Sequence, residues 1–157
     1  MKPKQDSPGV YFPPPLIYTL IFLIAFFMQK KVHIDNSAFQ LNLIKGVAVL
    51  FFAAAIYFLV MSLTQFIKTK NTVVLIKPAS SLQTGGVYGI SRNPMYVALA
   101  FVFLGMTCLI GNWWNIILFP LLIFIMQAYI IKSEEKYLER AFGNKYLEYK
   151  RRVRRWL

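Results

Sequence analysis

Histidine and cysteine each occur only once in this chain, as His33 and Cys108. A zinc or haem site made by the protein would have too few ligands, and a disulfide needs a second cysteine. A Ser-His-Asp triad is also unsupported, because His33 follows two lysines in a polar segment. Cys108 lies in an apolar run, where a small buried side chain is expected. We therefore expect no metal site, no redox pair and no triad.

Acidic residues are scarce as well, with 6 Asp and Glu against 18 Lys and Arg and a net charge of +12. In a soluble protein this balance would indicate a nucleic-acid partner. Hydrophobic residues make up 57% of the chain, however, above the ~45–50% of soluble domains. The positive charge is better explained by an anionic membrane surface. We expect contact with membrane lipids and no contact with nucleic acid.

Four apolar runs divide the chain, at residues 16–28, 41–67, 94–110 and 113–131. A membrane-spanning helix needs about 20 apolar residues. The second and fourth runs are long enough, whereas the first and third need tilt or a locally thinner bilayer. We predict a single domain over 1–157, an all-α integral membrane protein with about four transmembrane helices. Residues 1–67 would hold two spans, and 77–156 the polar loop, the helical hairpin and a C-terminal amphipathic helix.

Only Gly111 and Asn112 separate the third and fourth runs. Two residues allow only a tight helical hairpin between spans 3 and 4. Trp113 and Trp114 follow at once, as expected of an aromatic anchor at the membrane surface. One long broken helix is the alternative, but its combined length is too great for one span.

Lysine and arginine predict the orientation of such a protein. With four spans, 15 of the 18 Lys and Arg lie on the same side as both termini. Because cytoplasmic loops carry the excess of these residues, both termini of this multi-pass protein should be cytoplasmic. The cytoplasmic segment 133–156 is expected to form one amphipathic helix or two, with Ser133 as N-cap and a break at Gly143-Asn144.

The stretch TGGVYGISRNPMY, from Thr84 to Tyr96, is a polar glycine-rich loop directly before the third run. Its glycines permit close approach of a ligand to the backbone. Tyr88 and Tyr96 offer ring faces for an adenine or a sulfonium, and Arg92 offers donors. An ordinary cytoplasmic turn before a helix is the alternative interpretation.

Glu134 and Glu135 are the only adjacent carboxylates, placed where the fourth run ends. Carboxylates near a low-dielectric boundary need partners. Pairing with cations of the same helix is one explanation. The functional explanation is that these carboxylates accept hydrogen bonds from a ligand with ribose hydroxyls or an ammonium group.

The stretches KPASSLQTGGVYGISRNPMY and EEKYLERAFGNKYLEYKRRVRRW resemble the isoprenylcysteine carboxyl methyltransferase family. They are also similar to the wider group of membrane methyltransferases that includes phospholipid N-methyltransferases. The resemblance covers residues 77–156, about half of the chain, with two motifs in the family's order around the hairpin. It implies that S-adenosylmethionine binds between the loop and the helix after the hairpin.

The resemblance also implies roles for individual residues. The cofactor-binding residues would be Leu82, Gln83, Tyr88, Asn93, Pro94, Met95, Tyr96 and Glu134. Separately, as a hypothesis of mechanism, we expect Arg92 and Glu135 to orient the acceptor as catalytic residues.

Three positions depart from the family's pattern. Asn93 stands where its eukaryotic members have His, Gly89 where many small members have Arg, and Ile130 where the family has a substrate-contacting Arg. The last departure leaves open how a prenylcysteine carboxylate would be recognised, with Lys132 or Arg92 as candidate substitutes.

The resemblance predicts S-adenosylmethionine-dependent methyl transfer to a lipophilic or prenylated acceptor, most like isoprenylcysteine carboxyl O-methylation. Phospholipid N-methylation and S-methylation of a small thiol are the alternatives within this chemistry. A non-enzymatic membrane adaptor that uses the basic C-terminal segment is the alternative outside it. The two short spans leave a homodimer open.

Overall fold

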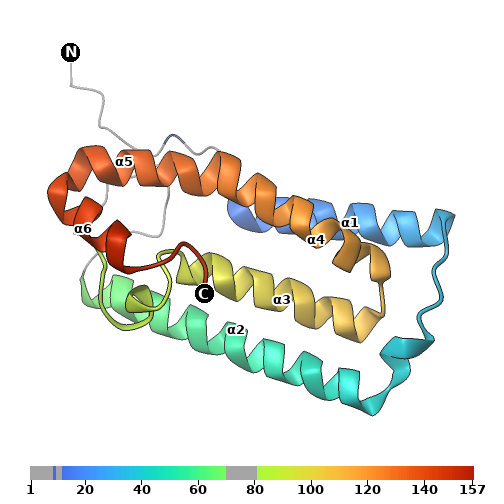
Figure 1. The fold of residues 1–157 in the computed structure, drawn as a ribbon. Coiled ribbons are helices and arrows are strands. Elements are labelled where there is room, and N and C mark those ends of the chain that lie inside the picture. The colour runs from blue at the N-terminus through green and yellow to red at the C-terminus, as the bar shows by residue number, and fades with distance from the viewer. Residues whose placement is uncertain (1–8, 10–11, 70–80) are drawn as a thin grey trace.

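The computed structural model describes residues 9, 12–69 and 81–157, which form helices and no strand (Figure 1). The all-α prediction is therefore confirmed for this part of the chain. The α-helices are α1 (Pro14–Lys31), α2 (Asn42–Lys68), α3 (Pro94–Ile110), α4 (Trp113–Ile125), α5 (Lys132–Phe142) and α6 (Asn144–Arg152). Two short 3₁₀ helices, η1 (Ser37–Gln40) and η2 (Gly86–Gly89), and a π-helix, η3 (Met126–Ile131), complete the elements.

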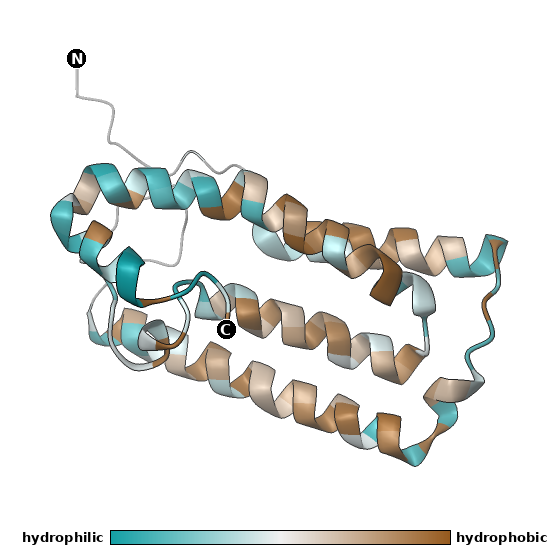
Figure 2. Ribbon diagram, in the orientation of Figure 1, coloured by the Kyte–Doolittle hydropathy of each residue, from teal (hydrophilic) through white to brown (hydrophobic). Residues whose placement is uncertain are grey.

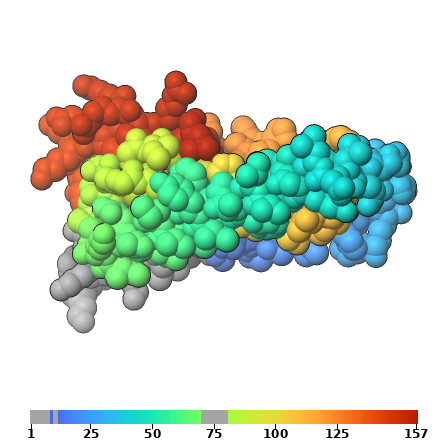
Figure 3. Space-filling view, turned by 90° about the horizontal axis from the view of Figure 1, so that it is seen from below, coloured from blue at the N-terminus to red at the C-terminus, as the bar shows by residue number. Residues whose placement is uncertain are grey.

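The long helices lie side by side in an elongated bundle, with α2 packed on α3 and α1 packed on α4 (Figure 1). Gly105 allows the close approach of α2 and α3, because a Cβ there would lie 3.0 Å from the ring of Phe52. The loop with η2 and the C-terminal helices gather at one end of the bundle (Figure 3). The other end carries η1 and the turn between α3 and α4.

Among the residues that the structure describes, two helices are long and apolar enough to cross a membrane, α2 and the continuous helix Trp113–Phe142, and α3 is a shorter apolar helix. The outer face of α2 is apolar, with Leu50 69% and Ile56 63% exposed. Hydrophilic residues concentrate at the end that holds the loop, α5 and α6 (Figure 2). Large exposed apolar faces of this kind indicate contact with lipid.

The predicted two-residue connection between α3 and α4 is present at Gly111 and Asn112. Gly111 has a φ of 69°, and a Cβ there would lie 3.0 Å from the Cβ of Phe39. The Asn112 side chain accepts a hydrogen bond from the Trp114 N–H at 2.9 Å and so caps α4. The indoles of Trp113 and Trp114 donate to backbone carbonyls of the segment after α1. The hairpin is thereby tied to the first helix.

The chain enters α5 directly from the π-helix η3, with helical dihedral angles at Lys132. The prediction that Ser133 is an N-cap is therefore wrong, because no helix begins there. Gly143, with a φ of 53°, separates α5 from α6, so the predicted break at Gly143-Asn144 is correct. A π-helix of six residues just before Glu134 and Glu135 was not expected; such segments are frequent at functional sites.

Candidate active site at the loop end of the bundle

Tyr96 and Glu134 bring the two polar motifs into direct contact. The Tyr96 hydroxyl, near the start of α3, donates a 2.8 Å hydrogen bond to Glu134 Oε1 on α5. Tyr96 is buried, and the Tyr18 hydroxyl on α1 donates to its backbone carbonyl at 3.2 Å. A carboxylate at the end of an apolar helix is thus held by a donor from the facing helix, which fixes its direction.

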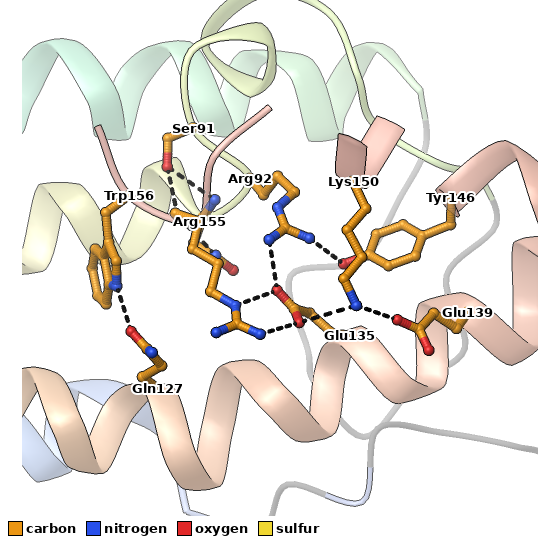
Figure 4. A network of polar contacts seen from close by, with 10 residues as sticks. Ser91, Arg92, Gln127, Glu135, Glu139, Tyr146, Lys150, Arg155 and Trp156 are labelled. Atoms are coloured by element: carbon orange, nitrogen blue, oxygen red, sulfur yellow. Dashed lines mark hydrogen bonds and ion pairs between the residues drawn. The ribbon is translucent and has the colours of Figure 1, made fainter. Parts of the chain in front are cut away.

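Glu135 is the centre of a network of charges (Figure 4). Arg155 donates two hydrogen bonds to it, from Nε at 2.7 Å and from Nη2 at 2.8 Å. Arg92 Nη2 lies 3.1 Å from Glu135 Oε1, and Lys150 Nζ lies 3.8 Å from Oε2. Lys150 also pairs with Glu139 at 2.5 Å. Three cations from three segments therefore converge on one buried carboxylate.

The residues around Glu135 favour the charged forms of the groups in this network. Hydrogen bonds to Glu135 raise the pKa of Arg155 further above its ordinary value. Burial, and then the negative charge of Glu135, raise the pKa of Tyr146 to about 12. Tyr146 accepts a 3.4 Å hydrogen bond from Arg92 Nη1 and stays a neutral hydroxyl at physiological pH. The Nε atom of Arg92 is buried and has no partner in the described residues.

Tyr88 lies in η2 and is buried against the α2–α3 core, with its ring 5.9 Å from that of Phe66. Its backbone carbonyl accepts a 2.6 Å hydrogen bond from the Tyr149 hydroxyl of α6. Burial raises the pKa of the Tyr88 hydroxyl above its ordinary range. The loop and α6 are therefore joined at a position that was expected to line a cofactor pocket.

The remaining predicted residues surround these contacts less closely. Asn93 is half-buried, and its amide donates to the carbonyl of Arg155 at 2.9 Å. Pro94 begins α3 and is fully buried, while Met95 beside it is half-buried. Gln83 is buried and donates to Ser81, and its neighbour Leu82 is half-buried.

Several residues of the site were not predicted from the sequence. Arg155, Lys150 and Tyr146 complete the contacts of Glu135 and Arg92. The Trp156 indole N–H donates to Gln127 Oε1, inside the fourth apolar run, at 3.4 Å. Trp156, near the end of the basic C-terminal segment, packs against both core clusters.

Apolar helices in a bundle, with a buried carboxylate–guanidinium network at one end, indicate a helical membrane protein. Residues 41–145 match the family model of phospholipid methyltransferases, and the chain belongs to this family. It is therefore a membrane methyltransferase, as the sequence motifs indicate.

Two relatives are similar to parts of the chain. One is an uncharacterized protein from Haemophilus influenzae, 41% identical over 66 residues, which are 40% of this chain and the whole of that protein. The other is a protein-S-isoprenylcysteine O-methyltransferase from Schizosaccharomyces pombe, 36% identical over 72 residues. That match spans 46% of this chain but only 30% of the yeast protein's length. No solved structure matches the chain.

Proposed function

We propose that the protein transfers a methyl group from S-adenosylmethionine to a lipophilic acceptor at the membrane interface, most like isoprenylcysteine carboxyl O-methylation. The hydrogen bond between Tyr96 and Glu134 is the observation that carries this proposal. It joins the loop motif to the carboxylate motif across two helices, as a site shared by both motifs requires.

The residues present fit S-adenosylmethionine, which carries an ammonium, a carboxylate and two ribose hydroxyls. Glu134 would accept from the hydroxyls or the ammonium. The unpartnered Nε of Arg92 would donate to a carboxylate, because a buried guanidinium donor without an acceptor is costly. Tyr88, Asn93 and the start of α3 would line the same space, with Leu82, Gln83, Pro94 and Met95 around it.

The bound cofactor supplies a methyl group on a sulfonium, which is already a good leaving group. The protein's task is then to hold the acceptor in line with that methyl and to exclude water. Arg92 and Glu135 would orient the acceptor. Since a carboxylate is ionised at neutral pH, its methylation needs no general base, and the site needs no histidine.

The charge around Glu135 favours an anionic acceptor. Arg92, Arg155 and Lys150 against Glu135 and Glu139 leave one net positive charge in the network, which would attract a carboxylate or thiolate acceptor. Ile130 is buried in the core and leaves recognition of an acceptor carboxylate to another residue. Lys132, which is exposed, is the remaining candidate for that contact, because the Nε of Arg92 is assigned to the cofactor's carboxylate and its Nη atoms contact Glu135 and Tyr146. An aminophospholipid, methylated on nitrogen, and a small thiol, methylated on sulfur, remain the competing acceptors.

We also propose four membrane spans, formed by α1, α2, α3 and the helix that begins with α4, with both termini cytoplasmic. The site would then face the cytosol, from which the soluble cofactor arrives, while the acceptor enters from the lipid. A single domain over 1–157 suits the mutual packing of these helices. A homodimer is not needed for any contact of the site described above.

Calorimetric titration of S-adenosylmethionine into detergent-purified protein tests this function. Glu134→Ala should abolish binding without loss of helical content, because it removes the carboxylate that accepts from the ligand. Wild-type protein with bound S-adenosylmethionine should then methylate N-acetyl-S-farnesylcysteine in preference to phosphatidylethanolamine in vesicles. No binding to well-folded wild-type protein would favour the membrane adaptor, and preference for the aminolipid would favour N-methylation.

A further inference from the structure

Residues 153–157 follow α6 without forming a helix, and they contact the loop before α3 through Arg154 and Arg155. The Arg92 backbone N–H donates to the carbonyl of Arg154 at 2.9 Å. The carbonyl of Arg155 accepts from both the Ser91 hydroxyl at 3.0 Å and the Asn93 amide at 2.9 Å. Three consecutive loop residues are thus bound to two consecutive residues of the C-terminal segment.

The side chain of Arg155 makes the second half of this connection. While its carbonyl binds the loop, its guanidinium forms a two-bond fork with Glu135 on α5. Arg92 binds the same carboxylate, so Glu135 is shared by two guanidiniums. Arg155 therefore sets both the position of the loop backbone and the direction of the carboxylate that Arg92 contacts.

Trp156 adds a third point of attachment. Its indole lies between the core cluster around Tyr96 and Met126 and the cluster around Tyr88, and its N–H reaches Gln127. Gln127 belongs to the π-helix just before Glu134. The segment thereby joins the loop, α5 and the helix that leads into α5. Arg154, Arg155 and Trp156 themselves lie outside residues 41–145, the part of the chain that matches the family.

We propose that Arg155 and Trp156 are positioning residues, which hold the loop with Arg92 and Asn93 at the correct separation from Glu134 and Glu135. This inference rests on the proposed function, because the separation matters only if a ligand is held between the two motifs. Loss of the Arg155 fork would leave Arg92 and Lys150 as the partners of Glu135. The Nε of Arg92 would then point away from the carboxylate of bound S-adenosylmethionine.

The test compares Arg155→Ala and Arg155→Lys with the control Arg152→Ala, which removes an exposed cation nearby at the end of α6. Affinity for S-adenosylmethionine should fall about 10- to 100-fold in Arg155→Ala, the usual effect of losing a hydrogen bond to a charged group. Arg155→Lys should recover only part of it, since an ammonium cannot form the fork. Arg152→Ala should bind as the wild type does.

Hydrogen exchange of the peptide that contains Arg92 provides a readout that needs no cofactor. Its amide is held by Arg154, so exchange should quicken in Arg155→Ala and in Trp156→Ala but not in Arg152→Ala, with helical content and melting temperature checked in parallel. Unchanged exchange and unchanged affinity in Arg155→Ala would overturn the inference. An equal loss in Arg152→Ala would overturn it too, because bulk charge would then be the cause. If wild-type protein binds no cofactor, the proposed function fails. The exchange result would still show whether Arg155 and Trp156 hold the loop in place.

Discussion

The hydroxyl of Tyr96 contributes one hydrogen bond to the site, and its removal is a small and specific change. Tyr96→Phe keeps the buried ring but leaves Glu134 without that donor. Affinity for S-adenosylmethionine should fall about tenfold or more, because hydrogen bonds to charged groups are worth ~1.5–3 kcal/mol. Calorimetry in detergent measures it.

Tyr129→Phe is the matched control, because this tyrosine is 70% exposed in the same half of the bundle. It should leave the affinity unchanged. Equal affinity in both variants and the wild type would show that the Tyr96–Glu134 pair serves packing alone.

Single site residues differ in how far their sequence context predicts them. Arg92, Tyr96 and Glu134 belong to two motifs of fixed order, so their proximity could be predicted. Arg155 is one of four arginines between positions 151 and 155, which look alike in the sequence. Which of them points inward depends on where α6 ends and how the chain turns after Arg152, and this is decided by tertiary packing.

The hairpin of α3 and α4 depends on the backbone of Gly111. Gly111→Ala should lower the free energy of unfolding by about 1–2 kcal/mol, because a left-handed conformation is strained for alanine. The close approach of Phe39 adds to this cost. Thermal unfolding followed by circular dichroism in detergent measures the change.

Gly46→Ala is the contrasting variant, since Gly46 lies inside α2 and a Cβ there meets no atom within 4 Å. Alanine in a helix interior should stabilise it by roughly 0.5–1 kcal/mol. A melting temperature that falls equally in both variants would show that the turn conformation is not what Gly111 contributes.

Helix positions were predictable from apolar runs, whereas the form of the last long helix was not. An apolar run of residues 113–131 predicts a helix, but a periodic pattern does not distinguish an α-helix from one that widens to a π-helix at Met126. The failed prediction for Ser133 has the same origin. A serine before two glutamates is typical of a helix start, yet here the preceding helix continues through it.

The distribution of charge along the bundle predicts how the protein lies in a membrane. Lys30, Lys31 and Lys45 are the cations near the hairpin turn, and the opposite end carries most of the others. Because positive residues are retained in the cytoplasm, the end with α5 and α6 should be cytoplasmic and the turn should face the other side. The fold alone is compatible with either orientation, since both ends are accessible.

Labelling of single cysteines tests this arrangement, and a chain with only one native cysteine is well suited to it. In a Cys108→Ser background, His33→Cys should react with a membrane-impermeant maleimide in intact cells, because His33 is exposed at the hairpin end. Lys145→Cys, exposed on α6, should react only after permeabilisation. The reverse pattern would invert the orientation and place the proposed site away from the cytosolic cofactor. Reaction of both positions in intact cells would contradict the proposed topology, because residues 34–144 would then not cross the bilayer an odd number of times.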